Sequence, residues 1–194
     1  WSRLKEKMAV NKLDPVSQSF TVEKPTYITK VDLFFATKDN NIPVFLQIRR
    51  ISDGFPSQQI VSNSQKIVPA ADINESADAT TATTITFNNP VFLDTGEYAL
   101  SVGSDSKEYS IYVSELNATD SVSGRKISEQ PLIGSLFLSE NLSTFTPSIF
   151  KDIKCNIYRA NFYTNVTANV NLTLDRGYIG CLLYTSDAAD DPAS

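Results

Sequence analysis

The 194-residue chain is 41% hydrophobic and 20% charged, the composition of a folded globular protein rather than of a disordered one. Its formal net charge of −5, with Lys and Arg scattered along the chain, argues against a nucleic-acid-binding groove, which needs clustered basic side chains. No stretch approaches the roughly 20 apolar residues of a membrane helix, and the absence of histidine removes the usual general base and the commonest zinc ligand.

The N-terminal third of the chain predicts a run of short strands. We interpret residues 1–12 as a linker from an upstream region, because no proline, glycine or clear cap brackets a helix there. From residue 13 onward apolar and polar residues alternate, which places every second side chain on the same face of a strand. Strands are predicted at residues 17–22, 28–37, 43–51, 58–61 and 65–68.

For two of these strands, the sequence also predicts which side chains are buried. In residues 28–37, Phe34 gives the second face an apolar patch, so both faces of this strand are expected to be covered. In residues 43–51, the alternation directs the aliphatic side chains into the core and Gln47 and Arg49 outward.

The middle of the chain combines tight turns with one long connection. Asp53 and Gly54 predict a hairpin turn, because this pair supplies the positive φ angles that such a turn requires. Residues 69–82 are polar and predict a surface loop with a helical turn near Ala71. Further strands, with a break at residues 88–90, are predicted at residues 84–87, 91–93, 98–102 and 109–113.

The C-terminal part of the domain is less regular. A long polar connection at residues 117–130 precedes an apolar run at 131–138 and a turn-rich stretch at 139–147. Residues 149–158 predict the closing strand, and residues 161–180 an extra strand or the start of a next module.

Together, the alternating segments predict the fold class. About nine or ten short strands separated by Gly, Asn, Asp and Pro clusters are typical of an all-β domain. We therefore expect an antiparallel β-sandwich, jelly-roll-like, over residues 13–160.

Carboxylates are the first candidates for chemistry, since a glycosidase needs only two of them facing a sugar. Nothing in their spacing pairs any two, and carboxylates at alternating strand positions usually lie on the solvated face. We therefore expect no catalytic residues and no enzyme activity. The candidates considered are Asp32, Glu97, Glu108 and Glu115.

Two turns offer oxygen ligands of the kind that calcium prefers, at residues 38–41 and 94–97. Neither has the spacing of a calcium-binding loop, and Asn, Asp and Gly at turns are explained by backbone geometry. We expect no metal site and no cofactor site.

Aromatic side chains on strands are candidates for stacking on sugars, although packing against a neighbouring sheet or subunit is the favoured interpretation. The candidate exposed rings are Phe34, Tyr109, Tyr112, Phe137 and Tyr158. N-x-Ser/Thr sequons, which we attribute to an Asn- and Thr-rich composition rather than to glycosylation, occur at Asn74, Asn117, Asn141, Asn165 and Asn171.

The chain has two cysteines, which require different interpretations. Cys155 alternates with Ile153 and Ile157 and is expected to be a small buried apolar residue. Cys181 opens the segment CLLYTSDAADD (residues 181–191), which resembles the translation of a transposase-type sequencing-library adapter. We therefore interpret residues 181–194 as an artefact, expected to be disordered, and the chain as a fragment.

Several segments in order resemble a known class of protein. The most specific are VDLFFATKDNNIPV (residues 31–44) and ISEQPLIGSLFLSEN (residues 127–141). They are similar to a domain of long virion structural proteins of tailed phages, notably T-even-like myoviruses of marine bacteria, of baseplate or tail-fibre type. The resemblance covers roughly residues 13–175.

The resemblance implies a non-enzymatic virion structural module located in the phage tail. Its expected partners are other tail or baseplate subunits, further copies of itself in the full-length protein and a host-surface glycan, with no nucleic acid and no membrane span. The alternative is a carbohydrate-binding β-sandwich module of a secreted or phage-borne polysaccharide-active protein, which predicts exposed coplanar aromatic rings on one sheet or at the loop ends.

Overall fold

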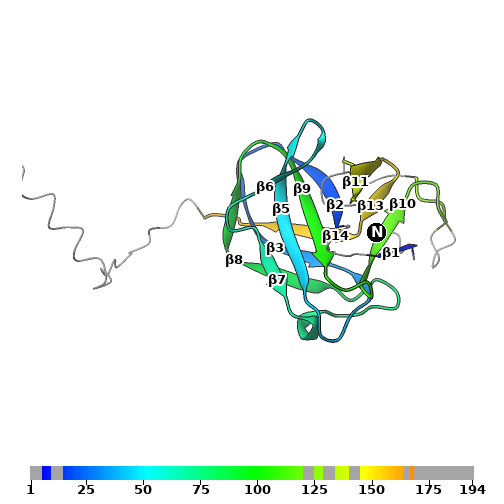
Figure 1. Cartoon of the computed structure of the whole chain (residues 1–194). Coiled ribbons are helices and arrows are strands. Elements are labelled where there is room, and N and C mark those ends of the chain that lie inside the picture. The colour runs from blue at the N-terminus through cyan, green and yellow to red at the C-terminus, as the bar shows by residue number, and fades with distance from the viewer. Residues whose placement is uncertain are drawn as a thin grey trace, which may run out of the picture. The chain divides into compact units, whose positions relative to one another are not determined.

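The computed structural model describes residues 6–9, 15–119, 125–128, 134–139, 145–163 and 167. The chain divides into two units, Trp1–Ala160 and Asn161–Ser194, and the following description concerns the first. The predictions for residues 1–5, 10–12, 181–194 and most of 161–180 lie outside the described residues. Within the described ranges the all-β class is confirmed, since one 3-10 turn, η1 (Ala70–Asp72), is the only helical element (Figure 1).

The front layer in Figure 1 is a seven-stranded antiparallel sheet. Its strand order is β12-β11-β2-β9-β5-β6, and β7 also pairs with β5. The strands are β2 (Val16–Val22), β5 (Val44–Ser52), β6 (Phe55–Ile60), β7 (Lys66–Val68), β9 (Gly96–Ser104), β11 (Leu136–Ser139) and β12 (Phe145–Ser148).

The second layer contains two smaller antiparallel sheets. One has the order β14-β3-β8, and the other has the order β1-β10-β13, with β4 also pairing with β10. Their strands are β1 (Glu6–Ala9), β3 (Thr26–Leu33), β4 (Phe35–Thr37), β8 (Thr83–Leu93), β10 (Ser110–Glu115), β13 (Lys151–Ile153) and β14 (Cys155–Arg159). The antiparallel β-sandwich is thus confirmed, whereas the jelly-roll connectivity stays a prediction. β1 lies within the segment interpreted as a linker.

The two smaller sheets meet at a three-way strand junction around Tyr112. β3 and β14 pair as far as Leu33 and Cys155 and then separate, so that β4 and β13 follow β10 in opposite directions. At the point of separation, the Tyr112 N–H donates to the Phe34 carbonyl and the Lys154 N–H donates to the Tyr112 carbonyl, each at 2.9 Å. One residue of β10 therefore satisfies the backbone groups that the divergence of β3 and β14 would leave unpaired.

The main core lies between the two layers and follows the predicted alternation. The inward side chains are β-branched, aliphatic or aromatic, and burying them is the main favourable contribution to folding. Completely or almost completely buried members include Val31, Leu33, Phe35, Val44, Leu46, Ile48, Ile85, Leu93, Leu100, Val102, Ile111 and Ile153.

A second, smaller cluster lies on the other side of the junction. Phe34 packs there with Tyr112 and Ala79, which confirms that both faces of the predicted strand at residues 28–37 are covered. The Tyr112 hydroxyl donates to the Ser76 carbonyl at 2.7 Å, and Lys154 Nζ donates to the Ala79 carbonyl at 2.6 Å. The predicted loop at residues 69–82, with its helical turn near Ala71, is therefore confirmed as a loop but partly buried, because its small side chains pack closely over this cluster.

The prediction that a strand ends at residues 88–90 is wrong. β8 continues through these residues, but its pairing with β3 shifts register between Ile28 and Lys30. Because β8 is an edge strand of its sheet, it tolerates Pro90, which has no N–H to donate, inside a bulge.

Two other expectations about strands need correction. The closing strand expected at residues 149–158 is split into β13 and β14, because Lys154 lies at the junction and the two halves join different sheets. Gln47 and Arg49 do face away from the core, but both are buried rather than exposed. Arg49 folds back along β5, and its Nε and Nη2 atoms donate to Gln47 Oε1 at 3.1 and 2.9 Å.

The turn between β5 and β6 provides a direct test of the hairpin prediction. Asp53 and Gly54 both adopt positive φ angles, of 53° and 80°. We expect Gly54→Ala to lower the free energy of unfolding by about 1 kcal/mol, because a Cβ is disfavoured in this left-handed region. Urea denaturation measures the change, with Asp53→Asn as the matched control, since asparagine tolerates the same conformation. Equal urea midpoints for Gly54→Ala and the unmodified chain would contradict the argument.

Candidate functional site

The outer face of the sheet β14-β3-β8 is the surface on which exposed rings, a buried carboxylate and a lysine come together. We call it the β3 face. The register places Tyr27 beside Phe92, Lys30 between Tyr158 and Thr86, and Asp32 between Asn156 and Thr84. Its members are Tyr27, Lys30, Asp32, Thr84, Thr86, Phe92, Asn156 and Tyr158.

Two rings form a cross-strand pair at one end of this face. Tyr27 is 39% exposed and Phe92 is 49% exposed, and their centroids are 5.1 Å apart with the planes inclined by 53°. Phe92 alternates with the buried Val91 and Leu93, so the strand pleat directs its ring away from the core. The pair therefore presents aromatic surface to solvent on a backbone that the ladder holds in place.

Asp32 organises the polar half of the β3 face. One carboxylate oxygen accepts a hydrogen bond from Thr84 Oγ1 at 2.7 Å, and the other accepts from the Tyr158 hydroxyl at 2.7 Å and from Asn156 Nδ2 at 3.3 Å. Burial opposes the charged form of Asp32, but these hydrogen bonds, together with the nearby Lys30 cation, hold the pKa of Asp32 below its ordinary value. The carboxylate thus stays charged and fixes the position of the Tyr158 ring.

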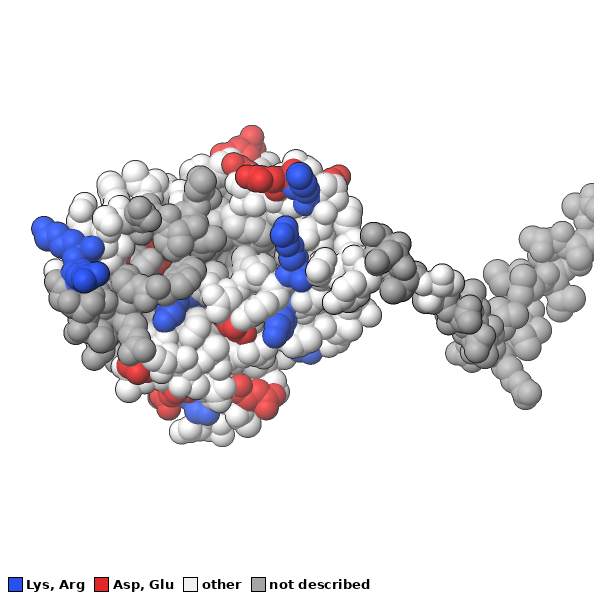
Figure 2. Space-filling model, turned by 180° about the vertical axis from the view of Figure 1, so that it is seen from behind, with Lys and Arg blue, Asp and Glu red and all other residues white. Residues whose placement is uncertain are grey.

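One cation lies beside this network. Lys30 Nζ is 4.3 Å from the centroid of the Tyr158 ring, a cation–π contact. The exposed Arg159, at the end of β14, pairs with Ile28 and lines a groove on the other side of the sheet together with Ile28 and Ile157. The layer of β3, β8 and β14 lies behind β5 and β9 in Figure 1, so Figure 2 views it from outside. In that view several Lys and Arg side chains form a line that runs from the upper edge of the globular part downward, while most acidic side chains lie near its upper and lower margins.

The five rings considered as candidates for exposure differ in how far they are buried. Tyr158 is exposed, whereas Phe34, Tyr109, Tyr112 and Phe137 are buried, which agrees with the favoured interpretation that such rings pack against neighbouring elements. Sequence reasoning missed Tyr27 and Phe92. The signal for Phe92 was its place between the inward Val91 and Leu93.

The four candidate carboxylates lie on different elements, with Glu108 in the connection between β9 and β10 and Glu115 on β10. Asp32 lies on β3 and Glu97 on β9, in different layers, while Glu115 forms an ion pair with Lys151 at 3.6 Å. In the described ranges, no hydrogen bond joins Asp32, Glu97, Glu108 or Glu115 to another of the four.

The two turns considered for calcium use their carboxylates internally. Asp39 accepts from the Asn41 and Ile42 N–H groups and from the Ser106 hydroxyl, and these hydrogen bonds lower the pKa of Asp39. Asp94 accepts from the Thr95 N–H at 2.7 Å. The part of the chain that the structure describes contains no group of three or more His, Cys, Asp or Glu side chains placed to hold a metal ion.

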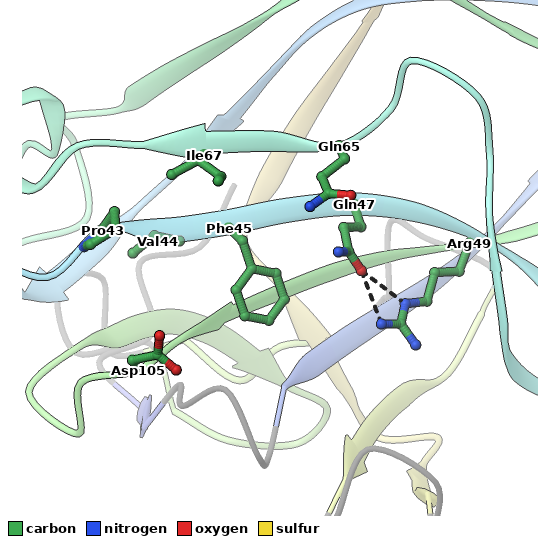
Figure 3. A pocket seen from close by; sticks show the side chains of 8 residues that line it. All are labelled: Pro43, Val44, Phe45, Gln47, Arg49, Gln65, Ile67 and Asp105. Atoms are coloured by element: carbon green, nitrogen blue, oxygen red, sulfur yellow. Dashed lines mark hydrogen bonds between the residues drawn. The ribbon is translucent and has the colours of Figure 1, made fainter.

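The second candidate surface is a groove on the outer side of β5, β7 and β9. This groove of about 340 Å³ has Phe45 at its centre, Arg49 with Gln47 at one end and Asp105 at the other (Figure 3). The Phe45 ring lies flat against Gly103, where a Cβ would approach it to 2.3 Å. Burial lowers the pKa of the Arg49 guanidinium. Its Nε and Nη2 atoms both donate to Gln47 Oε1. Gln47 and Arg49 hydrogen-bond to each other, so their burial is explained without a ligand. We therefore consider the groove a weaker candidate for a functional site than the β3 face.

The remaining predictions concern single residues. Cys155 is confirmed as buried, and burial, aided by the charge of Asp152, raises the pKa of its thiol to about 12, so the thiol is inert. Asn74 and Asn117 are exposed, whereas the sequons at Asn141, Asn165 and Asn171 lie outside the described residues. None of the described segments is a helix of the length and apolarity that a membrane crossing requires.

Comparison with known proteins adds no assignment. No protein-family model matches this chain, and no curated protein matches it. The functional argument therefore depends on the geometry described above and on the sequence resemblance.

Proposed function

We propose that this chain is a non-enzymatic structural module of a tailed-phage virion, in the baseplate or a tail fibre, that acts through protein–protein contacts and takes part in host attachment. The resemblance of residues 31–44 and 127–141 to such proteins supports the assignment. The structural observation that supports contact-based function best is an exposed apolar turn between β12 and β13.

Ile149 and Phe150 form this turn. Their side chains are 59% and 54% exposed, although the turn itself is held, because the Leu116 N–H donates to the Phe150 carbonyl at 2.8 Å. The ion pair between Lys151 and Glu115 lies next to it. Two adjacent large apolar side chains on a fixed backbone are suited to anchor a partner subunit, since such anchors dominate interface energies.

Mass spectrometry of purified virions tests the assignment directly. Tryptic peptides VDLFFATK (residues 31–38) and DNNIPVFLQIR (residues 39–49) are expected in tailed particles from the source community. Antibodies raised against this chain are expected to label the tail in electron micrographs. Detection of the peptides only in the particle-free secreted fraction would refute the virion assignment and favour the second candidate, a carbohydrate-binding module of a polysaccharide-active protein.

The role of the turn has its own test. We expect the double variant Ile149→Ser/Phe150→Ser to weaken association between copies of this chain, because it removes the anchor side chains. The free energy of unfolding should change by no more than about 0.5 kcal/mol, since both side chains are exposed. Sedimentation velocity measures the association. Ile67→Ser is the matched control, because Ile67 is equally exposed but lies on β7, away from the turn in sequence. Equal association of both variants and the unmodified chain would show that the turn is not an anchor.

A further inference from the structure

The groove beside Phe45 holds a positive charge that its own hydrogen bonds do not balance. Arg49 is only 6% exposed, and it donates to Gln47 Oε1 and, at 3.5 Å, to the Ser57 carbonyl, both of them neutral acceptors. We propose that this groove binds an organic monocarboxylate, with the carboxylate on Arg49 and an apolar body on Phe45. The proposal adds a ligand site to the module and does not rest on its assignment to a virion.

Within the described ranges, no carboxylate is placed to neutralise Arg49. Asp105 lines the opposite end of the groove, since it follows Ser104, which pairs with Val44 at the start of β5. Arg49 lies near the other end of β5, so the backbone positions of Asp105 and Arg49 are on the order of 15 Å apart. Glu97, on β9, is exposed and forms no ion pair with Arg49. The charge of Arg49 is therefore left for a ligand to balance.

The burial of this charge is costly. It lowers the pKa of the Arg49 guanidinium, because a cation is taken out of water without a counter-charge. An arginine nevertheless stays protonated at neutral pH, so the folded protein keeps a desolvated cation. An anion that reaches Arg49 meets a site that is already desolvated, where electrostatic attraction is stronger than at an exposed side chain.

The guanidinium also has donors that are not in use. Its Nε and Nη2 atoms donate to Gln47, and Nη1 donates to Ser57. Because each Nη atom carries two N–H groups, each keeps one that no described residue accepts. Paired donors of a guanidinium match the two oxygens of a carboxylate. A single cation also favours one negative charge over the several charges of a polyanion.

Phe45 defines the body of the ligand. Its ring is partly exposed and lies over Gly103 on the neighbouring strand, and Ile67, 59% exposed, lines the groove beside it (Figure 3). Arg49 folds back to Gln47, the next residue on the face of Phe45, which places the cation about 7 Å along the strand from the ring. The groove of about 340 Å³ and this spacing suit one small molecule with a charged end and an apolar end.

A simpler explanation is that Arg49 only covers the sheet. The apolar stem of an arginine does pack on such surfaces, and Gln47 satisfies part of the guanidinium. A methionine or leucine would cover the same surface without burying a charge. Coverage therefore does not account for a guanidinium at this position, whereas an anionic ligand does.

An NMR titration of the full chain tests the proposal. The probe is 3-phenylpropionate, which joins a carboxylate to a ring, and the signals followed are the Arg49 Nε–H and the Gln47 side-chain amide. We expect saturable shifts of both signals. The neutral amide 3-phenylpropionamide and the small anion acetate should each bind at least about tenfold more weakly, because each lacks one half of the ligand.

A third probe distinguishes two sources of the carboxylate. N-acetylphenylalanine presents the groups of a polypeptide C-terminus. Tighter binding of N-acetylphenylalanine than of 3-phenylpropionate would support the site and identify a chain end as the ligand. Weaker binding would support the site and identify a free small acid.

Two variants separate the charge from the ring. Arg49→Met keeps an apolar cover and removes the cation, so it should bind 3-phenylpropionate and its amide equally. Phe45→Leu keeps a cover over Gly103 and removes the ring, and it should weaken binding of the acid by roughly threefold to tenfold. Arg50→Gln is the matched control, because Arg50 is the next residue of β5, is exposed and points to the opposite face. It should bind like the unmodified chain.

Three results would overturn the proposal. They are no saturable shift with 3-phenylpropionate, equal affinity of the unmodified chain for the acid and its amide, and a preference for the acid that survives in Arg49→Met. The second result would show apolar contact alone, and the third would place the anion elsewhere. Thermal unfolding of each variant shows that it is folded at the temperature of the titration.

Discussion

Replacement of Tyr112 by alanine is expected to lower the free energy of unfolding by about 3–5 kcal/mol, the cost of emptying the site of a large buried aromatic side chain. Tyr112 is completely buried and fills the small cluster with Phe34 and Ala79. Its hydroxyl also holds the loop at Ser76. The truncation should therefore release residues 76–82 and loosen the junction, where the Tyr112 backbone pairs with Phe34 and Lys154.

A milder variant separates the hydroxyl from the ring. We expect Tyr112→Phe to cost about 1–2 kcal/mol, because the Ser76 carbonyl loses its side-chain donor while the packing stays. Urea denaturation gives both free energies, and hydrogen exchange of the amides of Thr80 and Thr81, which donate to Ser76 Oγ, reports on the loop. An alanine variant as stable as the phenylalanine variant would show that the ring contributes nothing at the junction.

Replacement of Asp152 by asparagine is expected to stabilise the protein at neutral pH, by an amount on the order of 1–3 kcal/mol. Asp152 is completely buried and lies beside Gln18, whose Nε2 donates to one carboxylate oxygen at 2.9 Å. Within the part of the chain that the structure describes, no group donates a hydrogen bond to the other oxygen. Burial raises the pKa of Asp152 from 3.8 to about 6, against the smaller opposing effect of the Gln18 hydrogen bond.

The pH dependence follows from the direction of this shift. Because the pKa is higher in the folded state, the stability associated with the protonated carboxyl is fully present below pH 3.8 and is lost as the pH rises through about 6. Asparagine remains neutral, so its advantage over aspartate should be small near pH 4 and reach its full size above about pH 7. Urea denaturation of both proteins at several pH values measures this difference. A difference that does not change with pH would contradict a titrating Asp152.

Much of the main core could be predicted from the alternation of apolar residues. The alternation places Val31, Leu33 and Phe35 on one face of their segment and Val44, Leu46 and Ile48 on one face of theirs, and all six are buried. Period-two patterning reports which side chains share a face, and in these strands the apolar face is the one that meets the opposite sheet.

The same pattern does not report what covers the second face. Gln47 and Arg49 alternate correctly yet are buried, and Tyr112 is buried on the face opposite its core neighbours. The strand junction depends on pairing between segments distant in sequence, and no local signal marks Lys154 as the residue where one strand becomes two. For this reason four of the five candidate rings are buried, with Tyr158 the exposed one, and Tyr27 and Phe92 were missed.

The pairing of β14 with β3 has a consequence for how this chain is made. β3 leaves the ribosome early, but one of its edges stays unpaired until Cys155–Arg159 has been synthesised. During that interval the unpaired backbone groups at this edge of β3 can pair with strands other than β14. The pairing of β3 with β14 also closes a long loop, which is slow. Any shortened version that stops before β14 keeps that edge open permanently and should aggregate. Constructing soluble pieces of this domain therefore requires keeping residues 151–159.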